Sequence, residues 1–425
     1  MRILTVAAVA ALLALNSCGT GKTVKCTGEP VYKHILLRDF RKGRDGIIVN
    51  YNIGTTAHCP GTLASLKKEL PDDVEFTVWA DSKLDPVLED MMAVRWPDVK
   101  IVYGTLDENA SDDLKAAVEE SDLLLVSSGS SIASSIHKSL KQYKSLTGKA
   151  TAAYAIGSGT PDVVKDMDFI WYRDEKSLDK AVKAGDQPAI CGFAPDAVFD
   201  FDCVDDEAAE RLLKEKGLLG ERFICCIPGN RITPGWEFFG GDPDEKKIAF
   251  NAEHADADNG ILRRIICECV REKGVKVLIC AEQVPEVKLG KEIVYDKLPD
   301  DVRSRCACLD TMWSPQLALA VYRRSAAVAG IQMHSPVMAV GNGVPAVILR
   351  HPGFGSKSDM WRTIGLGHWL IDIDDEDASD RACEAVLDIL DNPDAASRSV
   401  SAARTAIDSM RHHAVQVSFM APARR

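Results

Sequence analysis

The stretch Ala326-Ala-Val-Ala-Gly-Ile-Gln-Met-His-Ser-Pro-Val-Met-Ala-Val-Gly-Asn-Gly-Val-Pro-Ala-Val-Ile-Leu-Arg350 decides the fold. Apolar runs at 326–329 and 344–349 predict two short buried strands. Between them, Ser335-Pro336 predicts a helix start, with Ser as the N-cap and Pro at the first helical position. Two glycines then close that helix. Strand, helix and strand in this order are the repeating unit of an α/β protein.

His334 stands directly before the predicted helix start. Unpaired backbone N–H groups and the positive end of the helix dipole lie at such a position and favour anions. A titratable imidazole at a strand-to-helix turn is therefore a candidate acid or base. A structural role for this histidine is the alternative. Gln332 and Ser335, on either side, are candidate substrate-binding residues.

Length and charge bound the class of protein. The chain has 425 residues, enough for two or three domains, and its 46% hydrophobic and 27% charged residues are typical of a globular protein. The formal net charge is −12. Because an acidic chain repels a polyanion, and because there is no basic stripe, we expect no nucleic-acid partner.

The N-terminus resembles an export signal. Met1-Arg2 is followed by an apolar run at 3–15, which is too short to span a bilayer. Leu15-Asn-Ser-Cys18 is similar to a bacterial lipobox. We therefore expect a signal peptide over 1–17, lipidation of Cys18, and a tether over 18–44. An ordinary signal peptide cut near Ser17 is the alternative. In either case we expect export, and in the first case we expect the lipid to attach the protein to a membrane of the cell envelope.

The 13 cysteines predict no metal site. Many lie in apolar runs such as Phe223-Ile-Cys-Cys-Ile227, where cysteine usually acts as a small core residue. The Cys-x-Cys pairs at 267/269 and 306/308 do not have the Cys-x-x-Cys spacing of a zinc site. Disulfide pairing does not follow from the sequence.

From residue 45 onward, apolar strand-like runs alternate with helical patterns. This alternation predicts parallel sheets covered by helices on both faces. We expect an N-terminal Rossmann-like domain over 45–203, beginning with a strand at 46–51, and a C-terminal one over 204–392. A long polar loop is expected over 229–258, and a final helix and tail over 393–425. Two doubly wound domains would place a ligand in the cleft between them, at the carboxyl ends of strands.

Two strand-to-helix turns of the first domain carry candidate ligand-binding residues. Asn52 and Gly54 lie in the first turn, where glycine permits close approach of a ligand to the backbone. Ser128 and Gly129 lie in a second turn, which can hold a phosphate, a carboxylate or sugar hydroxyls. Ordinary capping turns are the alternative for both. Arg173 can clamp an anion through two hydrogen bonds or pair with Asp174.

The second domain adds four candidates outside the opening stretch. Asn230 and Arg231 begin the expected long loop, for which a solvated surface loop is the alternative. Glu282 follows a strand and can accept hydrogen bonds from sugar hydroxyls. Lys357 can hold an anion or lie on the surface.

Several of these motifs together resemble one family, over about residues 45–390. The matching segments are Asn52-Ile-Gly54, Arg173-Asp-Glu-Lys-Ser-Leu178, Ala194-Pro-Asp196, Gly330-Ile-Gln-Met-His-Ser335, Gly343-Val-Pro345 and Lys357. They are similar to the polysaccharide pyruvyl transferase family, in particular to a branch with Met-His-Ser-Pro at the key histidine. Gln332 stands where the family usually has arginine, and Thr55 stands where it usually has aspartate.

The resemblance implies a GT-B-like fold of two Rossmann-like domains. It also implies transfer of pyruvate from phosphoenolpyruvate onto two hydroxyls of an envelope polysaccharide or oligosaccharide, with no cofactor. His334 would be the acid or base, and Arg173 and Lys357 would hold donor anions. The alternatives are another carbohydrate-active transferase or hydrolase on the same fold, and a glycan-binding lipoprotein without catalysis.

Overall fold

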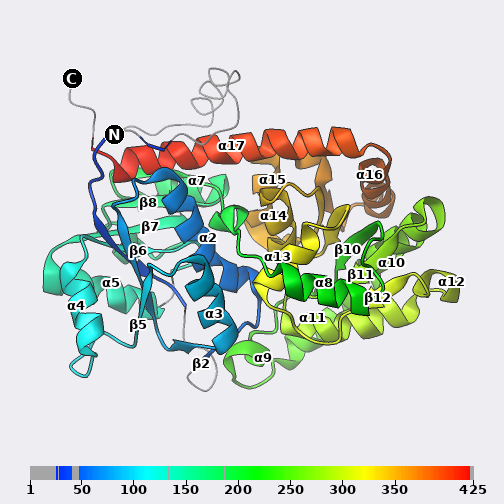
Figure 1. Ribbon diagram of the computed structural model, residues 1–425, viewed down its shortest axis with the longest axis horizontal. Helices are drawn as coiled ribbons and strands as arrows, with labels where there is room; N and C mark the ends of the chain where they lie inside the picture. Colours follow the sequence, from blue (N-terminus) through cyan, green and yellow to red (C-terminus); the bar gives the residue numbers. More distant parts are fainter. Residues whose placement is uncertain (1–24, 27, 41–46, 133, 186, 422–425) are drawn as a thin grey trace. The chain divides into compact units, whose positions relative to one another are not determined.

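The computed structural model describes residues 25–26, 28–40, 47–132, 134–185 and 187–421 (Figure 1). The chain divides into two compact units. The first contains Met1–Ile48, His58–Phe201 and Thr405–Arg425, and the second contains Val49–Ala57 and Asp202–Arg404. The expected signal peptide and Cys18 lie outside the described residues. Within the described ranges, no helix is both long enough and apolar enough to cross a membrane.

A seven-stranded parallel sheet forms the centre of the first unit, in the order β5-β3-β1-β6-β7-β8-β9. Numbered along the chain, these strands follow a doubly wound order whose direction reverses between β1 and β6. A two-stranded sheet of β2 and β4 lies apart from it. The strands of this unit are β1 (His34–Arg38), β2 (Ile47–Ile48), β3 (Glu75–Ala80), β4 (Lys83–Leu84), β5 (Lys100–Tyr103), β6 (Leu123–Val126), β7 (Ala150–Ile156), β8 (Phe169–Tyr172) and β9 (Ile190–Phe193).

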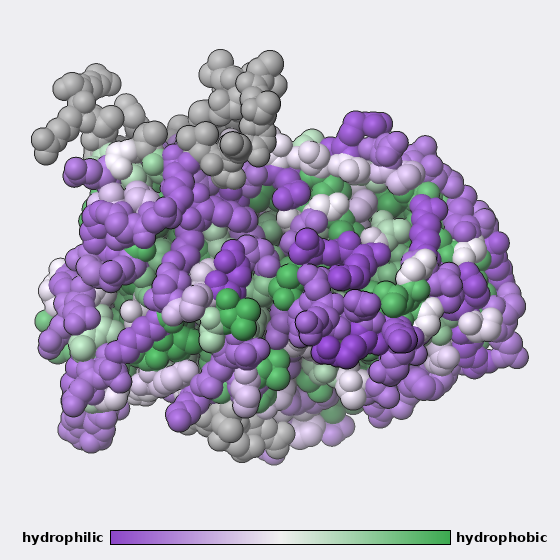
Figure 2. Space-filling view, in the orientation of Figure 1, coloured by the Kyte–Doolittle hydropathy of each residue, from purple (hydrophilic) through white to green (hydrophobic). Residues whose placement is uncertain are grey.

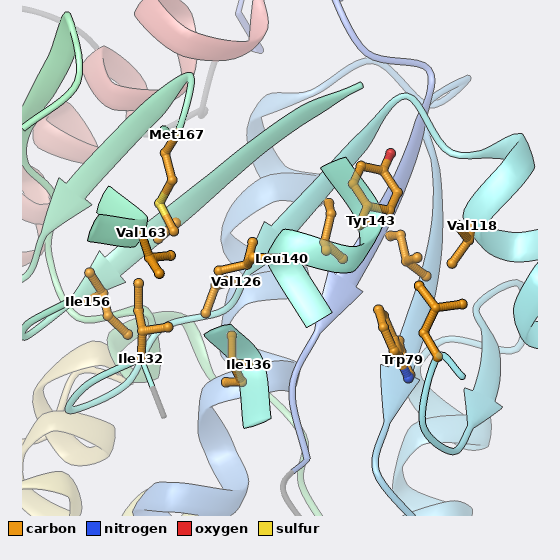
Figure 3. Close-up of a cluster of buried hydrophobic side chains, with 14 of the residues drawn as sticks. Trp79, Val118, Val126, Ile132, Ile136, Leu140, Tyr143, Ile156, Val163 and Met167 are labelled. Carbon is orange, nitrogen blue, oxygen red and sulfur yellow. The ribbon is translucent and has the colours of Figure 1, made fainter. Parts of the chain in front are cut away.

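Helices connect these strands. The helices of this part of the chain are α2 (Ile53–Glu69), α3 (Pro86–Arg95), α4 (Asp112–Glu120), α5 (Ser134–Thr147), α6 (Pro161–Val164), α7 (Glu175–Ala184) and the 3-10 turn η2 (Ala197–Asp200). In α5, the buried Ile136, Leu140 and Tyr143 recur at helical spacing and form one apolar face. Figure 3 shows Ile136 and Leu140 beside Val126 of β6, in a cluster that extends to Trp79 of β3.

The predicted tether over 18–44 is wrong for its described part, because β1 is a central strand of the first sheet. Ile35, Leu36 and Leu37 are buried, and the strand pairs on both sides. Arg38 at its end is also buried and forms an ion pair with Asp81. Three apolar residues between charged ones do not form a recognisable strand pattern, which explains the error. The strand predicted at 46–51 is reduced to the two residues of β2.

The second unit has a six-stranded parallel sheet in the order β12-β11-β10-β13-β14-β15. This is the order of a Rossmann domain, with its reversal between β10 and β13. The strands are β10 (Phe223–Ile227), β11 (Lys276–Ile279), β12 (Cys306–Cys308), β13 (Ala327–Gly330), β14 (Ala346–Arg350) and β15 (Leu370–Asp372). Both strands predicted in the opening stretch are therefore confirmed, and β10 and β13 are wholly buried.

The helices of the second unit surround this sheet. They are α8 (Asp206–Glu215), α9 (Gly235–Phe239), α10 (Glu245–Lys273), α11 (Val284–Leu289), α12 (Asp300–Arg303), α13 (Pro315–Tyr322), α14 (His334–Gly341), α15 (Met360–Thr363) and α16 (Ala378–Asp391). Shorter turns are the π-helical η3 (Gly290–Val294) and the 3-10 turns η4 (Tyr295–Lys297), η5 (Pro352–Asp359) and η6 (Gly367–Trp369). The helix α17 (Pro393–Phe419) follows, and its residues from Thr405 onward belong to the first unit.

Two expectations for the second unit are wrong. The long loop predicted over 229–258 contains α9 and the first half of α10. Asp244 caps α10 by accepting a hydrogen bond from the Lys247 N–H, and many of the polar side chains that suggested a loop are exposed on the helix surface. In addition, α14 begins at His334, so Ser335 is inside the helix and is not its N-cap.

Hydrophilic residues cover most of the molecular face in Figure 2, as the composition predicts.

Candidate functional site

The second unit brings several candidate residues together at the carboxyl ends of its central strands. β10 and β13 are the neighbours between which the strand order reverses, a position where open α/β sheets bind ligands. The chain leaves β10 through Pro228 and Gly229, and a methyl group on Gly229 would lie 2.3 Å from the Ile331 carbonyl oxygen. Glycine at 229 therefore lets the two chain segments that leave the sheet pack against each other.

A buried pair of acid and imidazole lies at this edge. The His334 Nδ1 atom is 3.2 Å from the Glu282 Oε1 atom. The other oxygen of Glu282 accepts hydrogen bonds from the Ser335 N–H at 2.6 Å and from the Ser335 hydroxyl at 2.9 Å. Glu282 is 1% exposed and His334 is 9% exposed. Both oxygens of Glu282 have protein partners in this structure, and binding of sugar hydroxyls by Glu282 stays a prediction.

These contacts keep the Glu282 carboxylate charged. Burial is the largest influence and by itself raises the pKa of Glu282. It is outweighed by the hydrogen bond and charge of His334 and by the two bonds from Ser335, so that the pKa of Glu282 lies below its ordinary value. A charged carboxylate against Nδ1 favours the tautomer with the proton on Nδ1. The Nε2 atom is then the nitrogen that accepts a proton.

The first turn of α2 belongs to the same site. Asn52 and Gln283 form an antiparallel bridge, with the Ile53 N–H donating to the Glu282 carbonyl at 3.0 Å. This pairing places Gly54 against the imidazole: a methyl group at Gly54 would lie 2.2 Å from His334 Cγ and 2.3 Å from Nδ1. The group that approaches the Gly54 backbone is the His334 side chain, and the predicted approach of a ligand there stays a prediction. Asn52 caps α2, its side-chain oxygen accepting from the Thr55 N–H at 2.9 Å.

Gln332 forms part of a second buried network beside this pair. Its amide nitrogen donates to Glu286 Oε1, which also accepts from the Gln283 amide at 2.9 Å. The other Glu286 oxygen accepts from the backbone N–H groups of Glu282 and Gln283. Burial, and then the charge of Glu282, raise the pKa of Glu286 well above its ordinary range. Gln332 therefore has a protein partner, and its contact with a substrate stays a prediction.

The candidate cations of the second unit are engaged elsewhere. Arg231 binds Asp258 through two hydrogen bonds of 2.8 Å and also contacts Asp374. Asn230, the residue before it, is partly buried. The Lys357 ammonium lies 5.0 Å from the centre of the Phe354 ring, in the 3-10 turn η5. Arg231 is held by two carboxylate partners, and its predicted contact with a substrate stays a prediction.

Candidate residues of the first unit form a separate buried cluster. Arg173 donates to Asp196 at 2.8 Å, and both are buried, so its partner is not Asp174. Asp174 instead caps α7. The Ser128 hydroxyl donates to the Ala155 carbonyl at 3.0 Å and accepts from the Ala197 N–H at 3.3 Å. These residues stabilise the turns after β6, β8 and β9, and the contacts of Ser128 and Arg173 with a ligand stay predictions.

Gly129 in the same cluster also has backbone partners. Its N–H donates to the Ala155 carbonyl, and its carbonyl accepts from the Gly157 N–H at 2.8 Å. The turn therefore joins β6 to β7, and binding of a phosphate, a carboxylate or sugar hydroxyls at Gly129 stays a prediction.

Sequence reasoning missed two acids with buried partners. Glu286 lies three residues after Gln283, and its side chain accepts from the Gln283 N–H at 3.0 Å. That spacing is typical of a capping box and would have marked the start of α11. Asp196 was part of a motif but was given no role, although it is fully buried and pairs with Arg173.

The fold has known counterparts among solved structures. No protein-family model matches the chain, and no curated protein matches it in sequence. S. aureus MnaA with UDP is similar at a TM-score of 0.54 and 10% sequence identity, over 90% of this chain and 94% of that chain. The Neisseria meningitidis UDP-GlcNAc 2-epimerase bound to UDP-GlcNAc has a TM-score of 0.51 and 9% identity, over 90% of this chain and 99% of that chain. E. coli ADP-heptose lipopolysaccharide heptosyltransferase II has a TM-score of 0.50 and 14% identity, over 85% of this chain and 99% of that chain. At these identities the likeness concerns the fold alone, and the chain consists of two Rossmann-like domains of the GT-B-like type.

Proposed function

We propose that this protein is a carbohydrate-active transferase in which His334 exchanges a proton with the reacting hydroxyl. The observation that carries the proposal is the buried pair of Glu282 and His334 at the switch point of the second sheet. A carboxylate on one ring nitrogen orients an imidazole and fixes its tautomer, which leaves the other nitrogen for proton exchange. His334 is the candidate catalytic residue, whereas Glu282 and Gly54 act as positioning residues.

We propose pyruvyl transfer as the specific reaction that the sequence motifs favour. Asn52-Ile-Gly54 and Gly330-Ile-Gln-Met-His-Ser335 are both part of the resemblance to polysaccharide pyruvyl transferases, and both contribute to this site. The donor would be phosphoenolpyruvate and the acceptor an envelope glycan. Two acceptor C–O bonds would form at the enol carbon that carries the phosphate, and the C–O bond to phosphate would break. Of the two hydroxyl protons, one would go to the enol CH2, which becomes the methyl group of the ketal, and the other would leave with the phosphate. His334 would accept a hydroxyl proton and pass it on in this exchange.

A nucleotide sugar is the second candidate donor. The side chains at His334, Glu282 and Gln332 contact one another and their neighbours through carboxyl, hydroxyl and amide groups. Gln332 also stands where the family usually has arginine. Arg231 and Arg173 already pair with carboxylates. With glutamine at the position of the family arginine and both arginines paired with carboxylates, support for a carboxylate donor is weaker than the family pattern alone would give. UDP and UDP-GlcNAc are bound in two of the similar structures.

We also propose that Cys18 is lipidated and holds the protein at the cell envelope. The support is the lipobox-like sequence that ends at Cys18.

Product analysis distinguishes the two donors. The purified protein is incubated with envelope oligosaccharide and with either phosphoenolpyruvate or a panel of UDP-sugars, and released phosphate and UDP are measured. Phosphate release with a mass gain of one pyruvyl group on the glycan supports pyruvyl transfer. UDP release with glycan extension supports glycosyl transfer. No turnover and no binding with any donor would contradict the transferase proposal.

A further inference from the structure

A second cluster of reactive side chains lies in the first unit, apart from the His334 residues. Cys26, Glu69 at the end of α2, and His412 on α17 converge there. Cys26 Sγ is 3.7 Å from His412 Nδ1 and 3.8 Å from Glu69 Oε2, and those two atoms are 2.8 Å apart. Cys26 and Glu69 are buried, whereas the His412 side chain is 43% exposed.

The geometry argues against a nucleophilic cysteine. In a triad of nucleophile, histidine and acid, the two partners contact different ring nitrogens. Here the thiol and the carboxylate both approach the same atom, His412 Nδ1. Three donors that converge on one point are instead the arrangement of metal ligands.

The distances fit a tetrahedral ion. Bond lengths of about 2.0–2.3 Å at tetrahedral angles require about 3.6 Å between sulfur and either other ligand, and about 3.4 Å between nitrogen and oxygen. The two distances from Cys26 Sγ, 3.7 and 3.8 Å, match this already. The His412–Glu69 contact of 2.8 Å has to open by only about 0.6 Å, since a metal replaces the hydrogen bond.

The surroundings of Glu69 also suit a bound cation. Its other oxygen accepts from Arg411 Nε at 2.9 Å, which holds the carboxylate in place, as hydrogen bonds to metal-ligating side chains commonly do. The charge of Arg411 is neutralised by Asp200, at 2.8 and 3.0 Å, and by Asp408 at 2.8 Å. Arg411 therefore keeps two other carboxylate partners when Glu69 binds a cation.

We propose that Cys26, Glu69 and His412 bind a zinc ion. The sulfur, nitrogen and oxygen donors are the set that zinc uses, and three protein ligands leave the fourth position to water on the exposed side of His412. Binding displaces the Cys26 proton and joins residue 26 to α2 and α17. Cysteine spacing could not predict this site, because its ligands come from three distant parts of the sequence.

Metal titration of the purified, reduced protein tests this proposal. After chelator treatment, the protein is titrated with zinc by calorimetry and with cobalt by absorbance, and its melting temperature is measured with and without zinc. We expect one equivalent of zinc, a higher melting temperature, and a thiolate-to-cobalt absorption band. Cys26→Ser and His412→Asn should each weaken zinc binding at least about tenfold, and Cys26→Ser should remove the band.

Two matched variants control for the other thiols and for the neighbouring histidine. Cys191→Ser changes another partly buried cysteine of the first unit, and His413→Asn changes the next residue of α17, whose ring lies against Trp171. Both should bind zinc as the unmodified protein does. Absence of stoichiometric zinc binding would overturn the proposal, as would full-affinity binding by Cys26→Ser or His412→Asn.

Discussion

Gly54→Ala tests whether the close contact between α2 and His334 is required for function. The new methyl carbon would lie 2.2 Å from His334 Cγ and 2.3 Å from Cβ and Nδ1. Carbon atoms in contact are about 3.5–4.0 Å apart, so the imidazole or the first turn of α2 must move by about 1.3–1.8 Å. A displacement of this size breaks the 3.2 Å contact between Nδ1 and Glu282.

The expected loss follows from that displacement. Misplacing a catalytic group by about 1 Å costs about 100-fold in rate, so we expect kcat to fall about 100-fold with a smaller change in KM. Overpacking of this kind also costs about 1–3 kcal/mol of unfolding free energy. The assays are steady-state transfer kinetics with the donor that the product analysis identifies, and urea unfolding of the same preparations.

Gly235→Ala is the matched control. Gly235 is the first residue of α9, and a methyl group there would meet no atom within 4 Å. We expect wild-type kinetics and unchanged or slightly higher stability. If Gly54→Ala also kept wild-type kinetics and stability, the inferred packing of His334 on α2 would be refuted.

Three further predictions concern other groups. Asp200→Asn should lower the unfolding free energy at neutral pH and reduce the dependence of that free energy on acid, measured by urea unfolding from pH 6 to 2.5. Burial raises the pKa of Asp200, but the charges of Arg411 and Lys68 outweigh this and lower the pKa from 3.8 to about 2. The wild-type carboxylate therefore contributes about 2 kcal/mol of stability above pH 4, which is lost as the pH falls from 4 to 2. A variant with the wild-type pH dependence would contradict this. Gln332→Met removes a donor to buried Glu286 and should cost about 1–3 kcal/mol in urea unfolding, and an unchanged midpoint would count against the network. Cys18→Ser should abolish incorporation of labelled palmitate and release the protein from membranes, whereas retained label would exclude lipidation at this residue.

The opening stretch could be predicted because its signals are local. Apolar runs at 326–329 and 344–349, with Ser335-Pro336 between them, determine strand, helix and strand in any α/β context. β13, α14 and β14 form there, with shifts of one or two residues at their ends. The same reasoning missed β1, whose apolar run is short and whose Arg38 is buried against Asp81.

The candidate site could be predicted only in part, because its contacts are tertiary. Sequence reasoning selected Gly54, Glu282 and His334 separately, as residues at strand ends. It could not show that residues 51–53 pair with 282–284, which brings the three together. It also predicted that Glu282 and Arg173 bind a ligand, whereas in the structure both side chains form hydrogen bonds with protein groups. Buried polar groups require partners, and only the folded structure shows which partners they have.

The most direct test of the central claim is the effect of His334→Asn on turnover and on donor binding. Asparagine preserves much of the side-chain volume and can still bond to Glu282, but it cannot exchange a proton near neutral pH. We predict that kcat falls at least about 100-fold while the donor Kd, measured by calorimetry, changes little. Turnover by His334→Asn at the wild-type rate would contradict an acid–base role for His334.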